Sequence, residues 1–283
     1  MNNSIACEIL NYNDAGTVIS LVERIKNYKN LSSIIIVDNC SDDDSLQKLR
    51  YMYGNNKKIQ IICTKKNGGY GYGNNYGIRF ASRMLGYKYV LLANPDIYFD
   101  EGSLNEMICT IKKNQNVGIV SAVQKTISNK EILDKAWKIP SDFEYIFSDT
   151  KISRILKLNS RYSLKHFNQR ISKVDCVPGA MLLIDADKFL KVGGYDEEMF
   201  LYCEETTLGY KFKEKGYSTL LLNDVSYNHL QSESIKKSIP SIVKQRKLIY
   251  KNRLLFLKKY KHIGRIKYII AKHVYLHIIK KIG

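Results

Sequence analysis

Single carboxylates follow two short apolar runs of this sequence, at places where a strand would end. Asp38 follows the run SIIIV at 33–37, and Asp96 follows YVLLA at 89–93 after one Asn-Pro pair. A carboxylate at such a strand end can accept hydrogen bonds from a nucleobase or from ribose hydroxyls. One carboxylate can also share a Mg²⁺ or Mn²⁺ ion with a diphosphate, because phosphate and water supply the other ligands. Taken singly, each of these acids could instead be a turn former or a helix cap.

A pair of adjacent glutamates, Glu204 and Glu205, lies in the aromatic segment FLYCEETTLGY. Burial beside aromatic side chains and a neighbouring like charge both raise the pKa of a carboxyl group, which suits a general base. The alternative is a surface pair at the start of a helix, where the helix dipole favours negative charge. His229 comes soon after the run STLLL at 218–222. It is either a ligand of the same metal ion or an ordinary histidine at a strand end.

A glycine-rich segment, NGGYGYGNNYG at 67–77, contains five glycines in eleven residues. Glycine lets the backbone approach a ligand closely or adopt a positive φ. The spacing matches neither the dinucleotide fingerprint GxGxxG nor the Walker pattern of a phosphate-binding loop. We therefore expect either a loop that packs against a ligand or a merely flexible turn, followed by a helix through residues 75–85.

Short apolar runs alternate with helical patterns along much of the chain. β-Branched runs bounded by Asn, Asp and Gly indicate strands, and apolar residues three and four positions apart indicate helices. The expected strands are 4–10, 33–37, 58–63, 89–93, 176–184 and 218–222, and the expected helices are 15–29, 43–53, 75–85 and the chain from 240 onward. Residues 130–172 should form an irregular or helical excursion over one side of the site. The alternation predicts an α/β fold with a mainly parallel sheet, in which the polar residues after the strands face one crevice.

The charge distribution divides the chain in two. Fifteen of the 45 Lys and Arg residues lie in 235–283 together with no Asp or Glu, so residues 1–234 carry 30 basic and 27 acidic residues. A nearly neutral body with a strongly basic tail suits an anionic partner, either nucleic acid or the anionic face of a membrane. Six isolated cysteines without a CxxC pair argue against a zinc ribbon or a disulfide framework and suit a reducing compartment.

Together and in this order, the motifs resemble the family 2 glycosyltransferases, and most of all their bacterial rhamnosyltransferase-like members. These are inverting enzymes with a GT-A fold that use nucleotide-sugar donors. The resemblance spans about residues 4–232 and rests on YN at 12–13, IVDNCSD at 36–42, NGGYGYGNNYG at 67–77, LANPD at 92–96, PGA at 178–180, GGYDE at 193–197, FLYCEE at 200–205 and His229. It implies a GT-A catalytic domain over 1–234, with a Rossmann-like sheet flanked by helices, and a basic amphipathic helical extension over 235–283.

The resemblance also implies roles for individual residues. Asp96 takes the place of the second Asp of the family's DxD motif and, with His229, would hold a divalent metal (Mg²⁺ or Mn²⁺) at the donor diphosphate. Glu205 takes the place of the catalytic base, with Glu204 as the alternative, and would deprotonate the attacking hydroxyl. Contacts to the donor nucleotide are implied for Tyr12, Asn13, Asp38, Asn67, Gly68, Gly71, Asn74 and Asn94. Two positions depart from the family pattern, since Glu205 replaces an Asp and Thr207 stands where an Asp is common.

The implied reaction transfers a hexosyl unit from dTDP-rhamnose or a UDP-sugar to a hydroxyl of a glycan acceptor. The acceptor would be linked to polyprenyl diphosphate, in bacterial capsule, O-antigen or cell-wall polysaccharide synthesis. The basic and apolar residues of 241–283 would lie on the anionic inner face of the cell membrane, pack on the catalytic domain, or join a homodimer. The sequence has no recognisable signal peptide or spanning segment, so we expect a cytoplasmic, peripherally bound enzyme without a nucleic acid partner.

Three other functions fit part of the pattern. A nucleotidyltransferase would need a glycine-rich loop with a basic residue after the first strand, where residues 11–14 read NYND. An RNA-binding protein could use the basic tail and the 21 tyrosines, because aromatic and basic residues together bind single strands, although the carboxylates at strand ends would repel phosphate. A catalytically inactive nucleotide-sugar-binding protein would explain the departures at Glu205 and Thr207.

Overall fold

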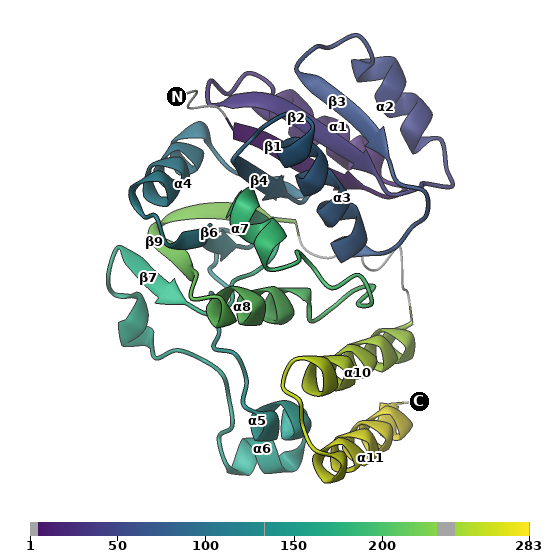
Figure 1. Ribbon diagram of the computed structural model, residues 1–283, viewed down its shortest axis with the longest axis vertical. Helices are drawn as coiled ribbons and strands as arrows, with labels where there is room; N and C mark the ends of the chain where they lie inside the picture. Colours follow the sequence, from purple (N-terminus) through teal and green to yellow (C-terminus); the bar gives the residue numbers. More distant parts are fainter. Residues whose placement is uncertain (1–4, 133, 231–240, 283) are drawn as a thin grey trace.

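One central sheet organises the part of the chain that the computed structural model describes, residues 5–132, 134–230 and 241–282 (Figure 1). The strand order is β3-β2-β1-β4-β8-β6-β9-β5, and β7 pairs with β9. The strands are β1 Ile5–Asn11, β2 Leu31–Asp38, β3 Ile59–Cys63, β4 Tyr89–Ala93, β5 Ile97–Tyr98, β6 Val117–Lys125, β7 Ile171–Val174, β8 Met181–Asp185 and β9 Ser218–His229. From β3 to β4 the neighbours are parallel, whereas β8 runs antiparallel to both β4 and β6. The α/β fold is confirmed, with a mixed sheet.

Helices cover both faces of the sheet. One face is buried by α1 Ala15–Ile25, α2 Ser45–Tyr53 and α4 Glu101–Lys113, and the other by α3 Tyr70–Arg83, α7 Ala186–Lys191 and α8 Glu204–Glu214. α1 forms as its sequence predicts, because Val18, Leu21, Val22 and Ile25 recur at helical spacing and all are buried. Apolar side chains are therefore buried between the sheet and the helices on both of its faces.

The strand ends determine where a site can form. Asn11 pairs with Asp38 at the ends of β1 and β2. Ala93, at the end of β4, faces the first residue of β8, which starts five residues later than the expected strand 176–184. β9 continues past the expected 218–222 to His229, which pairs with Ile97. The polar residues after β1, β2, β4 and β9 thus converge at one edge of the sheet, as α/β architecture requires.

Most of the glycine-rich segment is helical, which corrects the predicted loop. α3 begins at Tyr70, so residues 67–69 alone remain outside it. Gly69 has φ 89°, and a Cβ there would lie 2.1 Å from the carbonyl oxygen of Phe200. Farther along, a Cβ at Gly77 would lie 2.5 Å from Cγ of Glu8 on β1. Glycine weakens a helix, but here the missing side chains let α3 lie directly on the sheet, and this packing outweighs the low propensity.

The last two helices pack on the rest of the molecule. α10 Ile242–Lys259 and α11 Arg265–Ile282 lie beside α5 Asp142–Phe147 and α6 Lys151–Ile155 at the lower end of Figure 1, while the short helix η1 Leu164–Phe167 precedes β7. Their buried core is separate from the sheet and comprises Tyr145, Ile146, Met199, Tyr250, Phe256, Leu257, Ala271 and Tyr275. The basic and apolar alternation after residue 240 therefore encodes packed helices. The predicted domain boundary at 234/235 lies outside the described residues.

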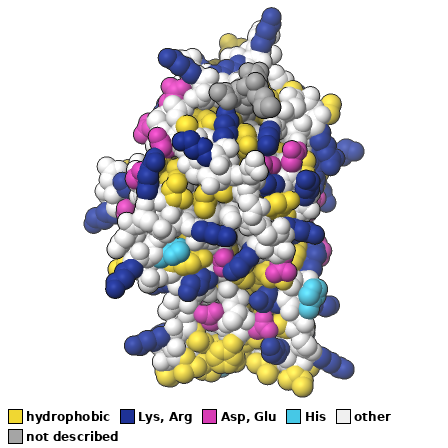
Figure 2. All heavy atoms as spheres, turned by 60° about the vertical axis from the view of Figure 1, so that its left-hand side comes forward, with side chains coloured by type: hydrophobic (Ala, Val, Ile, Leu, Met, Phe, Trp, Pro, Cys, Tyr) yellow, Lys and Arg dark blue, Asp and Glu magenta, His cyan; other side chains and the backbone are white. Residues whose placement is uncertain are grey.

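Apolar side chains remain exposed at this lower end. They belong to α6 and the residue that follows it (Ile152, Ile155, Leu156) and to α11 (Ile266, Ile269, Ile270, Leu276). Figure 2 shows a hydrophobic patch at the lower end, with Lys and Arg side chains around it. None of the helices in the described ranges is both long enough and apolar enough to span a membrane.

Candidate active site

A cavity of about 290 Å³ lies at the carboxyl edge of the parallel strands. Polar side chains from the ends of β1, β4 and β9 face apolar and aromatic side chains from the segments that enter α3 and α8. The lining residues are Leu10, Tyr12, Asp14, Asn39, Asn67, Gly69, Tyr70, Asn94, Pro95, Asp96, Gln124, Pro178, Gly179, Ala180, Phe200, Leu201, Glu204, Glu205 and His229. A concave site with a few convergent polar groups is typical of small-molecule binding.

Asp96 and His229 form a polar pair in this cavity. Oδ1 of Asp96 lies 3.1 Å from Nε2 of His229, and Asp96 is 7% exposed. This distance suits two neighbouring ligands of one ion that each bind at about 2.1 Å. Nδ1 of His229 is buried without a hydrogen-bond partner among the described residues. Within those residues, no group of three or more His, Cys, Asp or Glu could hold a metal, so an ion here would need phosphate oxygens as further ligands.

Three of the predicted donor contacts line the cavity: Tyr12, Asn67 and Asn94. Asn94 is oriented by Tyr70, whose hydroxyl lies 3.3 Å from Oδ1 of Asn94 and 3.0 Å from a backbone carbonyl oxygen. Oδ1 of Asn67 accepts the backbone N–H of Gly69 at 3.1 Å, which holds the turn that starts α3. The sequence motifs at 12, 67 and 94 thus meet at one cavity, although they are far apart along the chain.

Asp38 is buried, and its carboxylate is bonded to neighbouring side chains. Oδ2 accepts hydrogen bonds from Asn11 and from the Ser41 hydroxyl, both at 2.7 Å, and Oδ1 accepts the Ser41 backbone N–H at 3.0 Å. The cavity lining includes the next residue, Asn39, and does not include Asp38. In this arrangement Asp38 holds the loop after β2 beside the cavity, and its contact with a donor stays a prediction.

Four other predicted donor contacts are not among the lining residues: Asn13, Gly68, Gly71 and Asn74. The Asn13 side chain reaches the loop after β2, where its Nδ2 donates a hydrogen bond at 2.5 Å. Nδ2 of Asn74 donates to a carbonyl one turn earlier in α3 at 2.8 Å. A Cβ at Gly71 would lie 2.8 Å from Cβ of Tyr195. Their direct contact with a donor therefore also stays a prediction.

The adjacent glutamates open α8 and both reach the cavity. Glu204 is 6% exposed, and its Oε2 has no hydrogen-bond partner in the described part of the chain. Burial, and then the charge of Glu205, raises the pKa of Glu204 well above the ordinary glutamate value. Burial also raises the pKa of Glu205, against the effect of backbone hydrogen bonds that include one from Gly179. The pair therefore holds a proton more firmly than isolated glutamates do, which suits proton uptake near neutral pH.

A second cavity, of about 360 Å³, meets the first at Glu205, which contributes to both linings. Its walls come from the segment between β6 and β7 and from α8 and α10, and they comprise Trp137, Pro140, Glu144, Tyr145, Ser148, Leu158, Asn159, Ser160, Tyr202, Cys203, Glu205, Thr206, Ile249 and Arg253. Nε1 of Trp137 donates to Oγ1 of Thr206 at 3.1 Å, which fixes the indole beside α8. The excursion over 130–172, expected beside the site, supplies much of this wall.

Sequence reasoning missed several lining residues. Gln124 is the last but one residue of β6, a strand that the apolar pattern did not reveal. Its side-chain oxygen accepts a hydrogen bond from the Tyr227 hydroxyl at 3.0 Å. Tyr70 lay in the presumed loop, and Phe200 was noted as part of a motif without a role. The single tryptophan, Trp137, and the other aromatic residues of 130–172 were an available signal, since ligand sites are lined predominantly by apolar and aromatic side chains.

Comparisons with known proteins support a common origin. Residues 9–188 match the model of glycosyl transferase family 2. The chain is 26% identical over 215 residues to the low-salt glycan biosynthesis hexosyltransferase Agl10 of Haloferax volcanii, covering 76% of this chain and 63% of that protein. It is 23% identical over 212 residues to an N-acetylglucosaminyl-diphospho-decaprenol L-rhamnosyltransferase of Mycobacterium tuberculosis, covering 71% of this chain and 67% of that one. The aligned parts thus span about two thirds of these relatives.

The fold is similar to that of the mannosyltransferase PcManGT from Pyrobaculum calidifontis, solved with GDP-Man and Mn²⁺. The TM-score is 0.61 at 13% identity, over 97% of this chain and 70% of that one. The family match covers more than half of this chain and includes the ends of β1, β2 and β4 at the first cavity. The chain therefore has the GT-A fold and belongs to glycosyltransferase family 2.

Proposed function

We propose that the protein transfers a sugar, with inversion, from a nucleotide-sugar donor in the first cavity to a hydroxyl of an acceptor in the second. The observation that carries the proposal is the position of Glu205, which contributes to the lining of both cavities. A base at that junction can take the proton of an acceptor hydroxyl while its oxygen attacks the anomeric carbon of the donor. The raised pKa of Glu205 supports this role, since it makes the carboxylate a better proton acceptor.

A divalent ion, Mg²⁺ or Mn²⁺, would be held by Asp96 and His229 beside the donor diphosphate. The 3.1 Å separation of Oδ1 and Nε2 supports this assignment, as does the Mn²⁺ in the PcManGT structure. When bound, the ion supplies Lewis-acid stabilisation of the departing diphosphate. Asn94 lines the same cavity and is oriented by the Tyr70 hydroxyl, which supports a hydrogen bond from Asn94 to the donor.

The substrates follow from the family resemblance. We expect dTDP-rhamnose or a UDP-sugar as the donor and a glycan on polyprenyl diphosphate as the acceptor, in bacterial polysaccharide synthesis. The name of the mycobacterial relative, a rhamnosyltransferase acting on a diphospho-decaprenol-linked sugar, supports both. The second cavity supports a sugar acceptor, because it combines the aromatic faces of Trp137 and Tyr202 with the hydroxyl of Ser160 and the amide of Asn159.

The exposed apolar side chains of α6 and α11 support peripheral binding to the inner face of a membrane. Apolar side chains framed by Lys and Arg suit the headgroup zone of anionic lipid, and residues 235–283 carry fifteen basic and no acidic residues. Such binding would bring the enzyme to a lipid-linked acceptor. A second protomer is the alternative occupant of the same surface.

The first test is a thermal-shift panel of UDP, dTDP, GDP and CDP, each with and without Mn²⁺. Saturation at about 100 times Kd adds about 2.7 kcal/mol of stability, or roughly 5–10 °C in Tm for a chain of this size. One nucleotide should give a metal-dependent shift that Asp96→Asn abolishes, while Asp44→Asn, at a surface ion pair with Lys48, leaves it intact. Absence of a shift with every nucleotide contradicts the proposal.

The second test measures release of nucleotide and transfer of sugar by chromatography. Glu205→Gln should keep the nucleotide-induced shift and lose transfer. A wild-type protein that binds a nucleotide sugar without turning it over would instead identify the inactive binding protein. A salt-sensitive shift of RNA without any nucleotide response would identify the RNA-binding function.

A further inference from the structure

The segment that leads into the glutamate pair has an uncommon backbone. Tyr202 and Cys203 adopt φ values of 73° and 68°, so two consecutive non-glycine residues are left-handed immediately before α8 begins at Glu204. Single left-handed residues are uncommon outside glycine and asparagine, and such conformations persist only where the surroundings hold them. The direction in which the side chains of Glu204 and Glu205 point therefore depends on the contacts that fix this turn.

A side chain of α10 holds the turn from behind. Asn252 is 0% exposed, and its Nδ2 donates to the carbonyl oxygens of Leu201 at 2.7 Å and Tyr202 at 3.1 Å. One turn earlier in α10, the carbonyl oxygen of Ile249 lies 3.9 Å from Sγ of Cys203. A single amide thus bridges two successive carbonyls of the strained turn, a contact that no apolar side chain of the same size can make.

The last residue of α10 and the residue that follows it hold the beginning of the same segment. Lys259 pairs with Asp196 at 2.9 Å and with Glu198 at 2.6 Å, and the Tyr260 hydroxyl donates to Asp196 at 2.6 Å. Between these ends, Met199 is buried in the core that α10 and α11 share with α5. The whole segment 196–203 therefore rests on α10.

The opposite side of the segment touches the first cavity. The carbonyl oxygen of Phe200 accepts the backbone N–H of Tyr70 at 2.9 Å, at the start of α3. Phe200 and Leu201 both line the cavity proposed for the donor. Segment 196–203 consequently lies between α10 and the first cavity, and it ends immediately before the glutamate pair.

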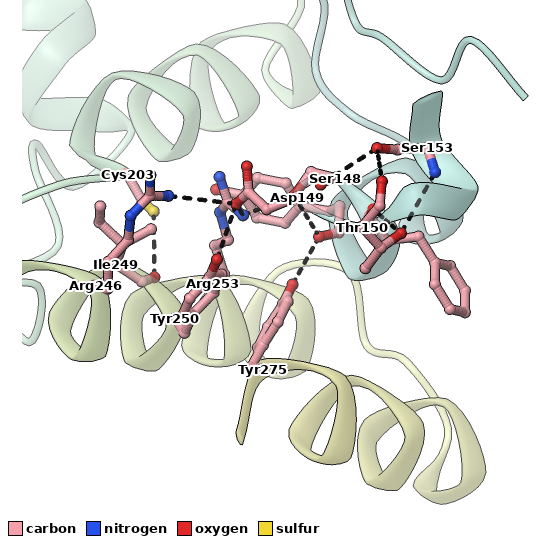
Figure 3. A network of polar contacts seen from close by, with 12 residues as sticks. Ser148, Asp149, Thr150, Ser153, Cys203, Arg246, Ile249, Tyr250, Arg253 and Tyr275 are labelled. Carbon is pink, nitrogen blue, oxygen red and sulfur yellow. Dashed lines mark hydrogen bonds and ion pairs between the residues drawn. The ribbon is translucent and has the colours of Figure 1, made fainter. Parts of the chain in front are cut away.

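α10 is itself anchored to the excursion after β6, as Figure 3 shows. Oδ2 of Asp149 accepts hydrogen bonds from Nη1 of Arg253 at 2.7 Å and from the Tyr250 hydroxyl at 3.1 Å, and Arg246 lies 3.8 Å away. Nη1 of Arg253 also reaches the Ser148 hydroxyl at 2.6 Å. These contacts fix the position of the helix that carries Asn252.

We infer that α10, which lies outside the family-matched residues 9–188, supports the turn that carries the base through one buried side chain, and that this side chain, Asn252, is a positioning residue for the base. The inference rests on the proposed function for the identity of the base. Asn252 touches no reacting atom; it acts through the turn at 201–203 and so sets where the carboxyl group of Glu205 lies between the two cavities. The amide donor, rather than the bulk of the side chain, is what the turn requires.

The first experiment asks whether Asn252 fixes the turn, and it needs no substrate. Asn252→Leu keeps a similar volume and removes the donor, and Lys251→Ala, at an exposed neighbour on α10, is the matched control. Hydrogen exchange of the peptide over 201–209 should accelerate at least about tenfold in Asn252→Leu, with β1 and β4 unchanged, because local opening is independent of global unfolding. Unchanged exchange, or acceleration that spreads to the sheet, overturns the inference.

The second experiment asks whether the turn serves catalysis. In Asn252→Leu, kcat for sugar transfer should fall about 100-fold with the donor KM within about twofold of wild type, since a misplacement near 1 Å costs a rate of that order. Lys251→Ala should retain wild-type kcat. Full activity in a variant whose turn exchanges faster refutes the positioning role. If the wild type turns over no nucleotide sugar, the proposed function fails, while the exchange experiment still decides whether α10 fixes the turn.

Discussion

Glu8 is a carboxyl group in β1 that the fold buries completely. It is 0% exposed, and neither of its carboxyl oxygens has a hydrogen-bond partner among the described residues. Gly77 of α3 lies directly over it, since a Cβ at Gly77 would come 2.5 Å from Cγ of Glu8. Burial raises the pKa of Glu8 well above its ordinary value. The native protein therefore keeps Glu8 as the neutral acid at a pH where the unfolded chain carries the carboxylate.

The substitution Glu8→Gln should consequently change the pH dependence of stability. Above about pH 4.3 the unfolded chain releases the Glu8 proton while the native protein retains it, so the wild type loses about 1.4 kcal/mol of unfolding free energy per pH unit through this group. The loss continues until the pH reaches the raised native pKa, and below about pH 4.3 the contribution is constant. The glutamine variant has no proton to lose. From about pH 4.5 to 6.5 the difference in unfolding free energy between Glu8→Gln and the wild type should change by up to about 2.7 kcal/mol in favour of the variant.

Urea denaturation at half-unit pH steps measures this difference. Glu214→Gln, at an exposed glutamate of α8, is the control and should give a curve parallel to that of the wild type. A constant offset between Glu8→Gln and wild type is expected, because a buried amide without partners has its own cost. The reasoning is refuted if the difference stays constant from pH 4.5 to 6.5, since Glu8 would then be ionised in the native state.

Three further results are expected. Glu205→Gln should lower the rate of sugar transfer by about 10²–10⁴-fold, whereas Glu204→Gln should retain most of the wild-type rate. Because burial raises the pKa of Glu205, the rate of Glu204→Gln should still rise with pH through a raised pKa. The opposite pattern would make Glu204 the base. Gly69→Ala should destabilise the fold by more than about 1 kcal/mol in urea denaturation, because φ is 89° and a backbone carbonyl oxygen lies 2.1 Å from the new Cβ, and near-wild-type stability would contradict this. Asp149→Asn should lower the free energy of unfolding by about 1–2 kcal/mol, because it removes the partner of an arginine of α10 that is 17% exposed. Asp44→Asn, at a surface ion pair, should lower it by less than about 0.5 kcal/mol. Equal losses in the two variants would contradict this reasoning.

Sequence patterns predicted the N-terminal half of the fold well for a physical reason. β1, β2, β3 and β4 are short apolar runs, and α1 has its apolar residues at strict helical spacing. In such segments local propensity and burial favour the same structure. The family motifs then indicated which strand ends meet, and the structure brings Tyr12, Asn67, Asn94 and Asp96 to one cavity.

Other elements could not be predicted, because long-range contacts decide them. α3 is helical despite its glycines, since those glycines allow contact with the sheet. β6 reads VGIVSAVQK, a mixed run whose burial comes from β8 and β9 on either side. The second cavity joins the excursion after β6 to α10, two segments about 100 residues apart in the sequence. No local pattern records such a juxtaposition.

Because α10 follows the base in the sequence, the ribosome makes Glu205 before the helix that holds it in position. Glu205 is synthesised well before Tyr260, and at about 5–20 residues per second the interval is roughly 3–11 seconds. At the start of that interval the strands β1 to β8 have already been made, while the turn at 201–203 still lacks the amide that fixes it. Such a chain has most of the strand ends of the first cavity before the base is held in position. The order of synthesis would thus keep sugar transfer slow until the helix that holds the turn has been made.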